Sequence, residues 1–286
     1  MPREMLGNRR VTGQEKFYTP PDIAENVCEQ VIKAVPNALE RSWLEPAGGT
    51  GAFIDAARRL GVQHIVSYDI EPLHPEVNQG DFLVQDLPLR SAIAIGNPPF
   101  GRNNALSVPF FNKCANFCDY IAFIVPRSWR KWSVINRLNA NFHLLEESDL
   151  SINYVDADGL DKYYGNNLRT CIQIWERREE VRRKIVIPDL GVVKKVGPQD
   201  ADVALTIFGY SCGTVKTAFP RRKITTEMYL KLEHPRAFEA LRSVDFSRFY
   251  NNVAYTESLS LQEINYLLNE YLFGSPYGEE DGPLHP

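Results

Sequence analysis

The stretch Ala92-Ile93-Ala94-Ile95-Gly96-Asn97-Pro98-Pro99-Phe100 joins an apolar run to a rigid polar turn. Two adjacent prolines cannot continue a helix or lie within a central strand, so we expect a buried strand over 92–96 that ends before Asn97. Neither proline has an N–H, so the turn offers carbonyl acceptors with few competing donors. With the Asn97 side-chain carbonyl and the flat ring of Phe100, the segment suits a planar group that carries an amine, such as an exposed adenine.

Strand-like and helix-like segments alternate on both sides of this turn. The spacing of apolar residues predicts helices over 22–35, with Asp22 as N-cap, and over 53–60, closed by Gly61. Further strands are expected over 42–45, 64–70, 120–125, 142–146 and 170–175, and a further helix over 104–118. This alternation is typical of an α/β fold with a mainly parallel, Rossmann-like sheet, helices on both faces, and ligands at the carboxyl ends of the strands.

The sequence changes its character after Trp175. Residues 176–184 are nearly all charged, which indicates a solvated helix or a linker. Short β-like runs follow within 185–220, and helices are expected over 224–245 and 258–273. We therefore predict a cofactor-binding catalytic domain over 1–178 and a small α+β domain over 179–286. We expect the second domain to recognise and bind a nucleic-acid target, and its tail after Gly274 to be poorly ordered.

Composition and cysteine usage narrow the class of protein. The chain of 286 residues is 44% hydrophobic and 24% charged, which is ordinary for a globular protein. No apolar run approaches the roughly 18 residues that cross a bilayer, and the first residues lack the apolar stretch of a secretory signal, so we expect a cytoplasmic protein without a membrane partner. The five cysteines form no CxxC pair, so we expect reduced, mostly buried thiols and no metal.

The net charge of −4 does not by itself indicate a nucleic-acid-binding protein. Any contact with a polyanion would depend on local basic clusters. These are Arg127, Arg130, Lys131 and Arg137; Arg177, Arg178, Arg182, Arg183 and Lys184; Lys194 and Lys195; and Arg221, Arg222 and Lys223. Each cluster alone is typical of a solvated face, but their number in an acidic chain keeps the functional interpretation open.

A glycine-rich turn follows the strand expected at 42–45. Gly48, Gly49 and Gly51 let the backbone approach a ligand, and the next helix points its N-terminus at that ligand. Glu45 precedes the turn, and a carboxylate there disfavours a phosphate and favours a ligand with a cationic part. S-adenosylmethionine has such a part, since it carries an ammonium and a sulfonium. The alternative is merely a tight strand–helix turn.

Two further acidic residues follow. Asp69 ends the next strand, where an acid typically accepts the ribose hydroxyls of a nucleoside, although it could also cap a turn. The triplet Gly80-Asp81-Phe82 offers an acceptor for an adenine amine and an aromatic wall, and it is also a common turn. Because Glu45, Asp69 and Asn97 all stand at the carboxyl ends of strands, we expect them to share one pocket.

The turn at 97–100 has a chemistry of its own. The amino nitrogen of adenine is a poor nucleophile because its lone pair is donated into the ring. The Asn97 side-chain carbonyl and the Pro98 backbone carbonyl can hold its two hydrogens, which draws the nitrogen toward tetrahedral geometry and aims the lone pair at a sulfonium methyl. Phe100 can stack on the base, worth about 1–3 kcal/mol, which offsets the few kcal/mol needed to flip a base.

Together these motifs resemble those of the adenine-specific amino-methyltransferases of the class I, S-adenosylmethionine-dependent fold. The motifs are FYTP at 17–20, EPAGGTGAF at 45–53, Asp69, GDF at 80–82 and NPPF at 97–100. Their order is similar to that of the gamma-type DNA adenine methyltransferases. The resemblance covers roughly residues 14–176, and NPPF with its upstream glycine turn is the most specific part.

The resemblance implies a role for each matching residue. The implied cofactor-binding residues are Thr19, Pro20, Glu45, Pro46, Ala47, Gly49, Asp69, Asp81, Phe82 and Asn97. Of these, Thr19, Pro20, Glu45 and Gly49 would line the methionine end of the cofactor. Asp69 would hold the ribose, and Asp81 and Phe82 would hold the adenine. The residues implied to grip the target base are Asn97, Pro98 and Phe100, and Pro99 completes the implied catalytic turn. Tyr163 or Tyr164 would supply the second wall of the base pocket, while Arg127, Arg130 and Lys131 would contact the nucleic acid.

Four functions can be compared with these motifs, and the motifs do not favour them equally. The favoured one is a DNA N6-adenine methyltransferase with S-adenosylmethionine as donor, of the kind found in restriction-modification. An RNA adenine methyltransferase is the alternative, because NPPF occurs in RNA-modifying relatives, but the FYTP segment and the C-terminal domain favour DNA. The opening Glu45-Pro46-Ala47 argues against a protein glutamine methyltransferase, and the intact motifs argue against a non-catalytic nucleic-acid-binding module. The oligomeric state is left open.

Overall fold

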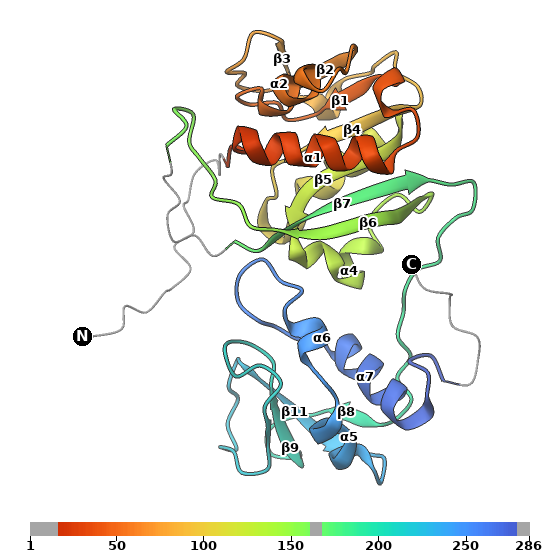
Figure 1. Cartoon of the computed structure of the whole chain (residues 1–286). Coiled ribbons are helices and arrows are strands. Elements are labelled where there is room, and N and C mark those ends of the chain that lie inside the picture. Colours follow the sequence, from red (N-terminus) through yellow and green to blue (C-terminus); the bar gives the residue numbers. More distant parts are fainter. Residues whose placement is uncertain (1–16, 161–167, 279–286) are drawn as a thin grey trace. The chain divides into compact units, whose positions relative to one another are not determined.

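The computed structural model describes residues 17–160 and 168–278, and these divide into two compact units (Figure 1). Among the described residues, unit 1 contains 17–125, 145–160 and 172–177, and unit 2 contains 126–144, 168–171 and 178–278. The chain thus passes between the units at several points, one of them at Arg177 and Arg178. The domain boundary at 178 stays a prediction, and Tyr163 and Tyr164 lie outside the described residues.

A seven-stranded sheet with the order β3-β2-β1-β4-β5-β7-β6 forms the frame of unit 1. Its strands are β1 (Trp43–Glu45), β2 (Ile65–Asp69), β3 (Val77–Gln79), β4 (Ala92–Gly96), β5 (Cys118–Pro126), β6 (Phe142–Leu150) and β7 (Thr170–Arg177). The pairs β3–β2, β2–β1, β1–β4 and β4–β5 are all parallel. The carboxyl ends of β1, β2 and β4 therefore meet at one edge of the sheet, as expected.

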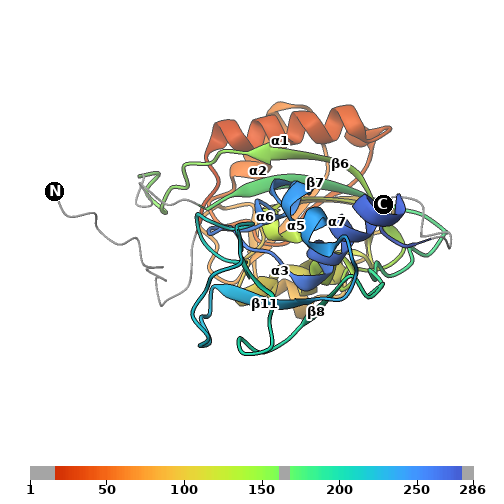
Figure 2. The same ribbon diagram turned by 90° about the horizontal axis from the view of Figure 1, so that it is seen from below.

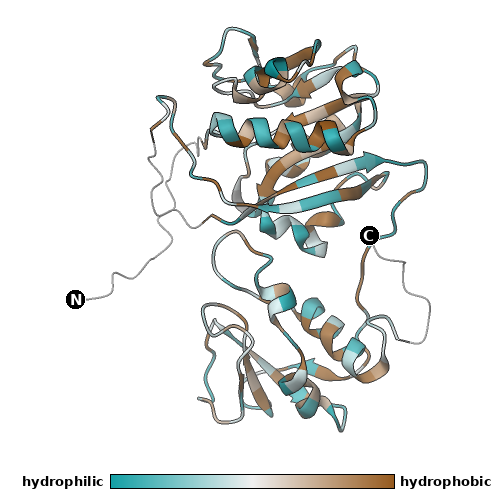
Figure 3. Ribbon diagram, viewed as in Figure 1, coloured by the Kyte–Doolittle hydropathy of each residue, from teal (hydrophilic) through white to brown (hydrophobic). Residues whose placement is uncertain are grey.

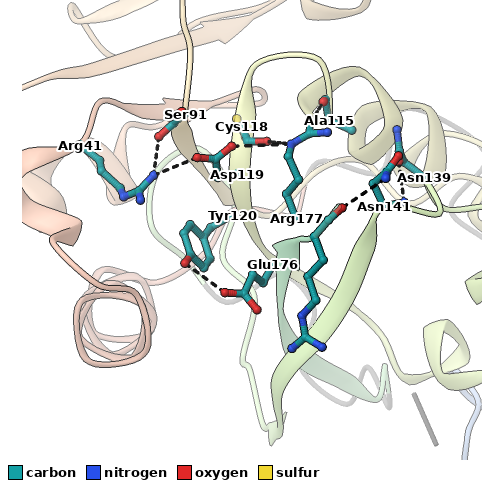
Figure 4. A network of polar contacts seen from close by, with 11 residues as sticks. Arg41, Ser91, Ala115, Cys118, Asp119, Tyr120, Asn139, Asn141, Glu176 and Arg177 are labelled. Carbon is teal, nitrogen blue, oxygen red and sulfur yellow. Dashed lines mark hydrogen bonds and ion pairs between the residues drawn. The ribbon is translucent and has the colours of Figure 1, made fainter. Parts of the chain in front are cut away.

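A polar network holds the opposite edge, where β5 begins (Figure 4). Asp119 at the start of β5 pairs with Arg41 at 3.2 Å and with Arg177 at 3.6 Å. Arg41 also donates to the Ser91 carbonyl at 2.8 Å, and Arg177 donates to the Cys118 carbonyl at 3.1 Å. Because Arg177 ends β7, the end of β7 lies beside the start of β5, so these two strands run in opposite directions. The sheet is mainly, but not wholly, parallel.

Helices cover both faces of this sheet. They are α1 (Pro21–Ala34), α2 (Ala52–Arg59) and α3 (Ser107–Cys114), with short 3-10 turns at η1 (Ala38–Glu40), η2 (Phe82–Val84) and η3 (Arg102–Asn104). Val27 of α1 belongs to one core cluster with Ile95 of β4. Phe111 of α3 packs edge-on against Phe123 of β5 and Trp175 of β7, with ring centroids 6.4 and 5.7 Å away. Figure 2 shows α1 and α3 on opposite sides of the strands.

Unit 2 has its own core. Its antiparallel sheet has the order β10-β9-β11-β8, with β8 (Val193–Lys195), β9 (Val203–Thr206), β10 (Val215–Lys216) and β11 (Glu227–Leu232). Its helical segments are η4 (Arg127–Arg130), α4 (Trp132–Ile135), α5 (Ala237–Ser243), α6 (Ser247–Tyr250) and α7 (Leu261–Phe273). Leu205 and Leu230 of the sheet share a buried cluster with Leu241 of α5 and Leu268 of α7. Figure 3 shows hydrophobic residues along these strands and along β4 and β5 of unit 1.

The structure confirms the predicted fold class. The strand order of unit 1, with helices on both faces, is that of a Rossmann-like class I methyltransferase sheet, and unit 2 is a small α+β unit. The strand predicted over 92–96 is β4, and the helix predicted over 22–35 is α1. Among the described residues no helix is both long and apolar enough to cross a membrane. Four of the five free cysteines are buried, as predicted, and the fifth, Cys212, is partly exposed.

Three local predictions are wrong. Asp22 is not an N-cap, because Pro20 holds that position and Asp22 lies in the first turn of α1. The helix expected over 104–118 extends only from Ser107 to Cys114, since Asn104 has a positive φ of 58° and Cys118 already begins β5. Residues 178–184 form neither helix nor strand, which agrees with the linker and not with the helix of the two alternatives given for this segment. The helix expected over 224–245 is replaced at its start by the strand β11.

Candidate functional site

The glycine turn after β1 is packed too tightly for side chains. A Cβ at Gly48 would lie 2.1 Å from the Ser67 hydroxyl and 2.9 Å from a methyl of Val77. Gly49 has a positive φ of 46°, and its N–H donates to Asp69 at 2.8 Å. The left-handed backbone and the close neighbours together require glycine, so the turn brings its bare backbone to the carboxyl edge of the sheet.

Asp69 ties the end of β2 to this turn. One carboxylate oxygen accepts from the Gly49 N–H and the other from the Glu71 N–H, at 2.8 and 2.9 Å. Each oxygen of an ionised carboxylate has two lone pairs, so both keep the capacity to accept a further hydrogen bond. Asp69 is half-buried and therefore still reaches solvent. Asp69 therefore holds the glycine turn in place through these two hydrogen bonds, and its role in binding a ribose stays a prediction.

Glu45 ends β1 with a carboxyl group that is almost completely buried, 1% exposed. It accepts a hydrogen bond of 3.0 Å from the Ser67 hydroxyl. Burial raises its pKa well above the ordinary value, the Ser67 hydrogen bond lowers it, and the negative charges of Asp69 and Asp55 raise it further. A buried acid in acidic surroundings is stabilised in its charged form by a cation that enters beside it.

Asn97 follows β4 with its side-chain amide held in one orientation. Its amide nitrogen donates to the Phe17 backbone carbonyl at 3.1 Å. Its amide oxygen is buried and has no hydrogen-bond partner within the described residues. An amide oxygen and nitrogen are told apart by their hydrogen bonds, and this donor to a carbonyl fixes which atom is which. A buried acceptor without a partner is costly, so the site is built for a donor that arrives from outside.

The segment at 17–20 is fastened against this edge of the sheet. Tyr18 and Val155 exchange two backbone hydrogen bonds of 3.2 Å, and the Phe17 ring lies 5.2 Å from that of Tyr154. The Tyr18 ring covers Gly49, since a Cβ there would lie 2.7 Å from it. The Thr19 hydroxyl is buried and, like the Asn97 oxygen, lacks a partner among the described residues. The FYTP segment, the glycine turn and Asn97 thus form one site.

The other predicted cofactor and base residues vary in their exposure. Pro46 and Pro98 are buried, whereas Pro20, Ala47 and Pro99 are half-buried. Asp81 is exposed and accepts from the Leu83 N–H at 2.9 Å, which starts the η2 turn. Phe82 is 1% exposed and packs on Phe110 at 5.7 Å, so it belongs to the core in this conformation. Phe100 is 8% exposed, so its ring is nearly covered.

The predicted basic contacts belong to unit 2, and their role toward a substrate stays a prediction. The Lys131 ammonium lies 3.1 Å from both carboxylate oxygens of Glu263. The Arg127 N–H donates to the Arg169 carbonyl at 3.0 Å. Arg130 follows in the same 3-10 turn, η4. Lys131 is therefore engaged in an ion pair within its own unit.

Sequence reasoning missed three contributors to the site. Ser67 left a signal, because a polar residue two positions before Asp69 in a strand shares its face and points to the same ligand region. The Phe17 carbonyl and Val155 left none. Their contacts depend on pairing between segments that lie far apart in the sequence.

Comparisons with known proteins agree with a methyltransferase-type unit. No family model matches the chain. It is 28% identical over 166 residues to the Type II methyltransferase M.HincII of Haemophilus influenzae, which covers 53% of this chain and 31% of that protein. The match to the Type II methyltransferase M.HindII of Haemophilus influenzae strain Rd has the same identity and covers 30% of that protein. The chain thus spans about a third of the length of the curated relatives it matches.

Among solved structures, the chain is similar to PH1948 of Pyrococcus horikoshii, which is described as a candidate RNA methyltransferase. The TM-score is 0.46 at 18% identity, with 58% of this chain and 88% of that chain covered. A modification subunit described for a type I restriction enzyme of Vibrio vulnificus gives 0.40 at 19% identity, covering 58% of this chain and 46% of that chain. Both scores lie below 0.5, so the fold assignment rests on the strand order of unit 1 and not on these likenesses.

Proposed function

We propose that the protein is an S-adenosylmethionine-dependent N6-adenine methyltransferase that acts on DNA. The observation that carries this proposal is the buried Asn97 amide oxygen, which lacks a partner among the described residues while its amide nitrogen is held by the Phe17 carbonyl. An oriented acceptor at the carboxyl edge of a class I sheet suits an incoming amine. The Type II methyltransferase relatives support the same class of reaction.

The residues at the sheet edge fit the proposed cofactor. The turn at Gly48 and Gly49 brings backbone without side chains to this edge of the sheet. The Thr19 hydroxyl, which lacks a partner among the described residues, can serve the methionine end. Glu45 offers a buried carboxylate to the ammonium, and Asp69 keeps acceptor capacity for ribose hydroxyls. When bound, S-adenosylmethionine would supply an electrophilic methyl group on a sulfonium.

The chain's own groups prepare the nucleophile. The Asn97 amide oxygen and the Pro98 carbonyl each accept one hydrogen of the adenine amine, which turns its lone pair out of the ring. The hydrogen bond from Asn97 to the Phe17 carbonyl prevents the amide from rotating its nitrogen into that place. This is catalysis by orientation and preorganised dipoles, so no strong base is required. As the new N–C bond forms, the bond from the methyl carbon to sulfur would break and its electron pair would go to sulfur, with S-adenosylhomocysteine as the leaving group. The proton then leaves the nitrogen for solvent.

A labelling experiment tests the proposal. The protein is incubated with methyl-labelled S-adenosylmethionine and separate pools of DNA, RNA and protein, and each labelled pool is hydrolysed and analysed by mass spectrometry. We expect label in DNA, recovered as N6-methyldeoxyadenosine. Label recovered only in RNA, in glutamine, or at a cytosine would refute the proposed substrate. Asn97→Ala serves as the matched control and should lower the label recovered in DNA.

A further inference from the structure

Charge is distributed unequally between the two units. In its described residues unit 2 carries 19 Lys and Arg against 12 Asp and Glu, a net charge of +7, whereas unit 1 carries 8 against 18, a net charge of −10. The three acidic residues at 279–281 lie outside the described residues, and counting them leaves unit 2 at +4. A basic unit within an acidic chain is the electrostatic signature of contact with a polyanion.

Two neighbouring loops of unit 2 hold large aromatic side chains out toward solvent. Tyr210 is 92% exposed at the tip of the hairpin between β9 and β10, and Phe208 beside it is 46% exposed. Tyr255, in the loop between α6 and α7, is 40% exposed. We call these three residues the aromatic tip. Exposure of apolar rings to water is unfavourable in free energy, so three exposed aromatic side chains on adjoining loops indicate a binding surface.

The backbone of these loops is well fastened. Within the hairpin, the Thr206 N–H donates to the Thr214 carbonyl at 2.9 Å, and the Gly213 N–H donates to the Thr206 carbonyl at 2.8 Å. Between the loops, the Gly209 N–H donates to the Glu257 carbonyl at 3.0 Å, and Phe208 forms a β-bridge with Ser258. The rings are therefore presented by an ordered scaffold, which lowers the entropy lost when a partner binds.

Basic residues adjoin the same loops. The Lys131 ammonium lies 3.4 Å from the Ser258 carbonyl, and the Arg169 N–H donates to the Ala254 carbonyl at 2.7 Å. Lys131 pairs with Glu263 and Arg169 pairs with Glu257, so both cations lie beside the aromatic tip and both already contact a carboxylate. The net charge of +7 over the described residues of unit 2 favours a nucleic acid over an acidic or neutral protein surface as the partner.

We propose that the aromatic tip of unit 2 stacks on bases of the DNA substrate while the adjoining basic residues contact its phosphates. The inference rests on the proposed function for the identity of the substrate, but not on the catalytic role of Asn97. Stacking of a base on an aromatic side chain is worth about 1–3 kcal/mol. Tyrosine and phenylalanine have few rotatable bonds and a flat face, which suits them to insert between or beside bases.

Substitutions at the tip test this proposal by DNA binding. Dissociation constants for a labelled DNA duplex and for its single strand are measured by fluorescence anisotropy with the full chain. We expect Tyr210→Ala to weaken binding about 5- to 150-fold, the range that a stacking free energy of about 1–3 kcal/mol gives. Tyr210→Phe keeps the ring and should bind within about twofold of the wild type. Phe208→Ala should weaken binding in the same direction.

Controls separate this inference from the proposed activity. Phe273→Ala removes an aromatic side chain that is equally exposed, at 41%, but ends α7, and it should leave DNA binding unchanged. S-adenosylmethionine affinity, measured by calorimetry, should be the same in all variants, which shows that unit 1 is intact. Wild-type DNA affinity in Tyr210→Ala and Phe208→Ala overturns the tip proposal even if methylation is observed. Ring-dependent DNA binding without methylation would uphold the tip and refute the proposed function alone.

Discussion

Replacing Glu45 with glutamine should stabilise the protein without cofactor and weaken its hold on the cofactor. Glu45 is 1% exposed, and burial raises its pKa well above the ordinary value. Glutamine has nearly the same shape as glutamate, its side-chain carbonyl can still accept from the Ser67 hydroxyl, and its amide does not ionise. The variant therefore removes the free-energy cost of keeping an ionisable group in this position, with little change in packing.

The pH dependence of this effect has a definite sign. Below the unfolded-state pKa of about 4.3 the carboxyl is protonated in both states, so folding costs nothing extra. As the pH rises above that value, the unfolded chain releases its proton while the folded chain retains it, so the wild type loses stability until the raised folded-state pKa is reached. The stability gained by Glu45→Gln should therefore be near zero at pH 4 and grow toward pH 8.

The size of the effect follows from this linkage. Each unit by which folding raises the pKa corresponds to about 1.4 kcal/mol, and about 1 kcal/mol changes Tm by roughly 2–4 °C in a unit of this size. We expect a Tm increase of at least about 2 °C at pH 8 in thermal unfolding followed by circular dichroism. Glu40→Gln, at an exposed position, is the matched control and should show no pH-dependent gain.

Cofactor should reverse this order of stability. If the Glu45 carboxylate pairs with the ammonium of S-adenosylmethionine, saturating cofactor will raise the Tm of the wild type more than that of the variant. A hydrogen bond to a charged group is worth about 1.5–3 kcal/mol, so Glu45→Gln should bind cofactor roughly 10- to 150-fold more weakly. A variant that is no more stable than the wild type at pH 8, or whose gain is the same at every pH, would refute this reasoning.

Three other changes have defined outcomes. Gly48→Ala places a Cβ 2.1 Å from the Ser67 hydroxyl, so we expect lower Tm and impaired cofactor binding by calorimetry; wild-type affinity would contradict the packing of the turn. Asp69→Ala removes the acceptor of the Gly49 N–H and should weaken cofactor about tenfold with DNA affinity unchanged. Ser260→Ala breaks the capping box with Glu263 and should cost about 1 kcal/mol in urea unfolding, without affecting cofactor binding.

The fold could be predicted where local sequence and tertiary environment agree. β4 matches its predicted range because five apolar residues stop at a turn with two prolines, which allows few other structures. β11 could not be recognised, since its apolar residues also fit a helical spacing. In the structure Leu230 packs on one face of the small sheet and Tyr229 on the other, so the strand is buried on both sides and lacks the alternation that would identify it.

The candidate site was predictable to the extent that it follows from strand ends. The parallel order of β1 and β2 brings Glu45, Asp69 and the glycine turn together, and the hydrogen bond from the Gly49 N–H to Asp69 agrees with that expectation. The orientation of Asn97 was not predictable. It depends on a backbone carbonyl 80 residues away, and a backbone carbonyl has no residue-specific signature in the sequence.

The central claim is that the Asn97 amide oxygen holds the reacting amine, and single-turnover kinetics test it most directly. Methyl transfer to an adenine-containing DNA duplex is followed by rapid quench at saturating cofactor and DNA, for the wild type and Asn97→Ala. We predict a fall of at least about 100-fold in the transfer rate, consistent with the loss of one preorganised group in the reaction, with cofactor affinity changed less than about threefold. A variant that binds cofactor normally and transfers the methyl group at the wild-type rate would contradict the account.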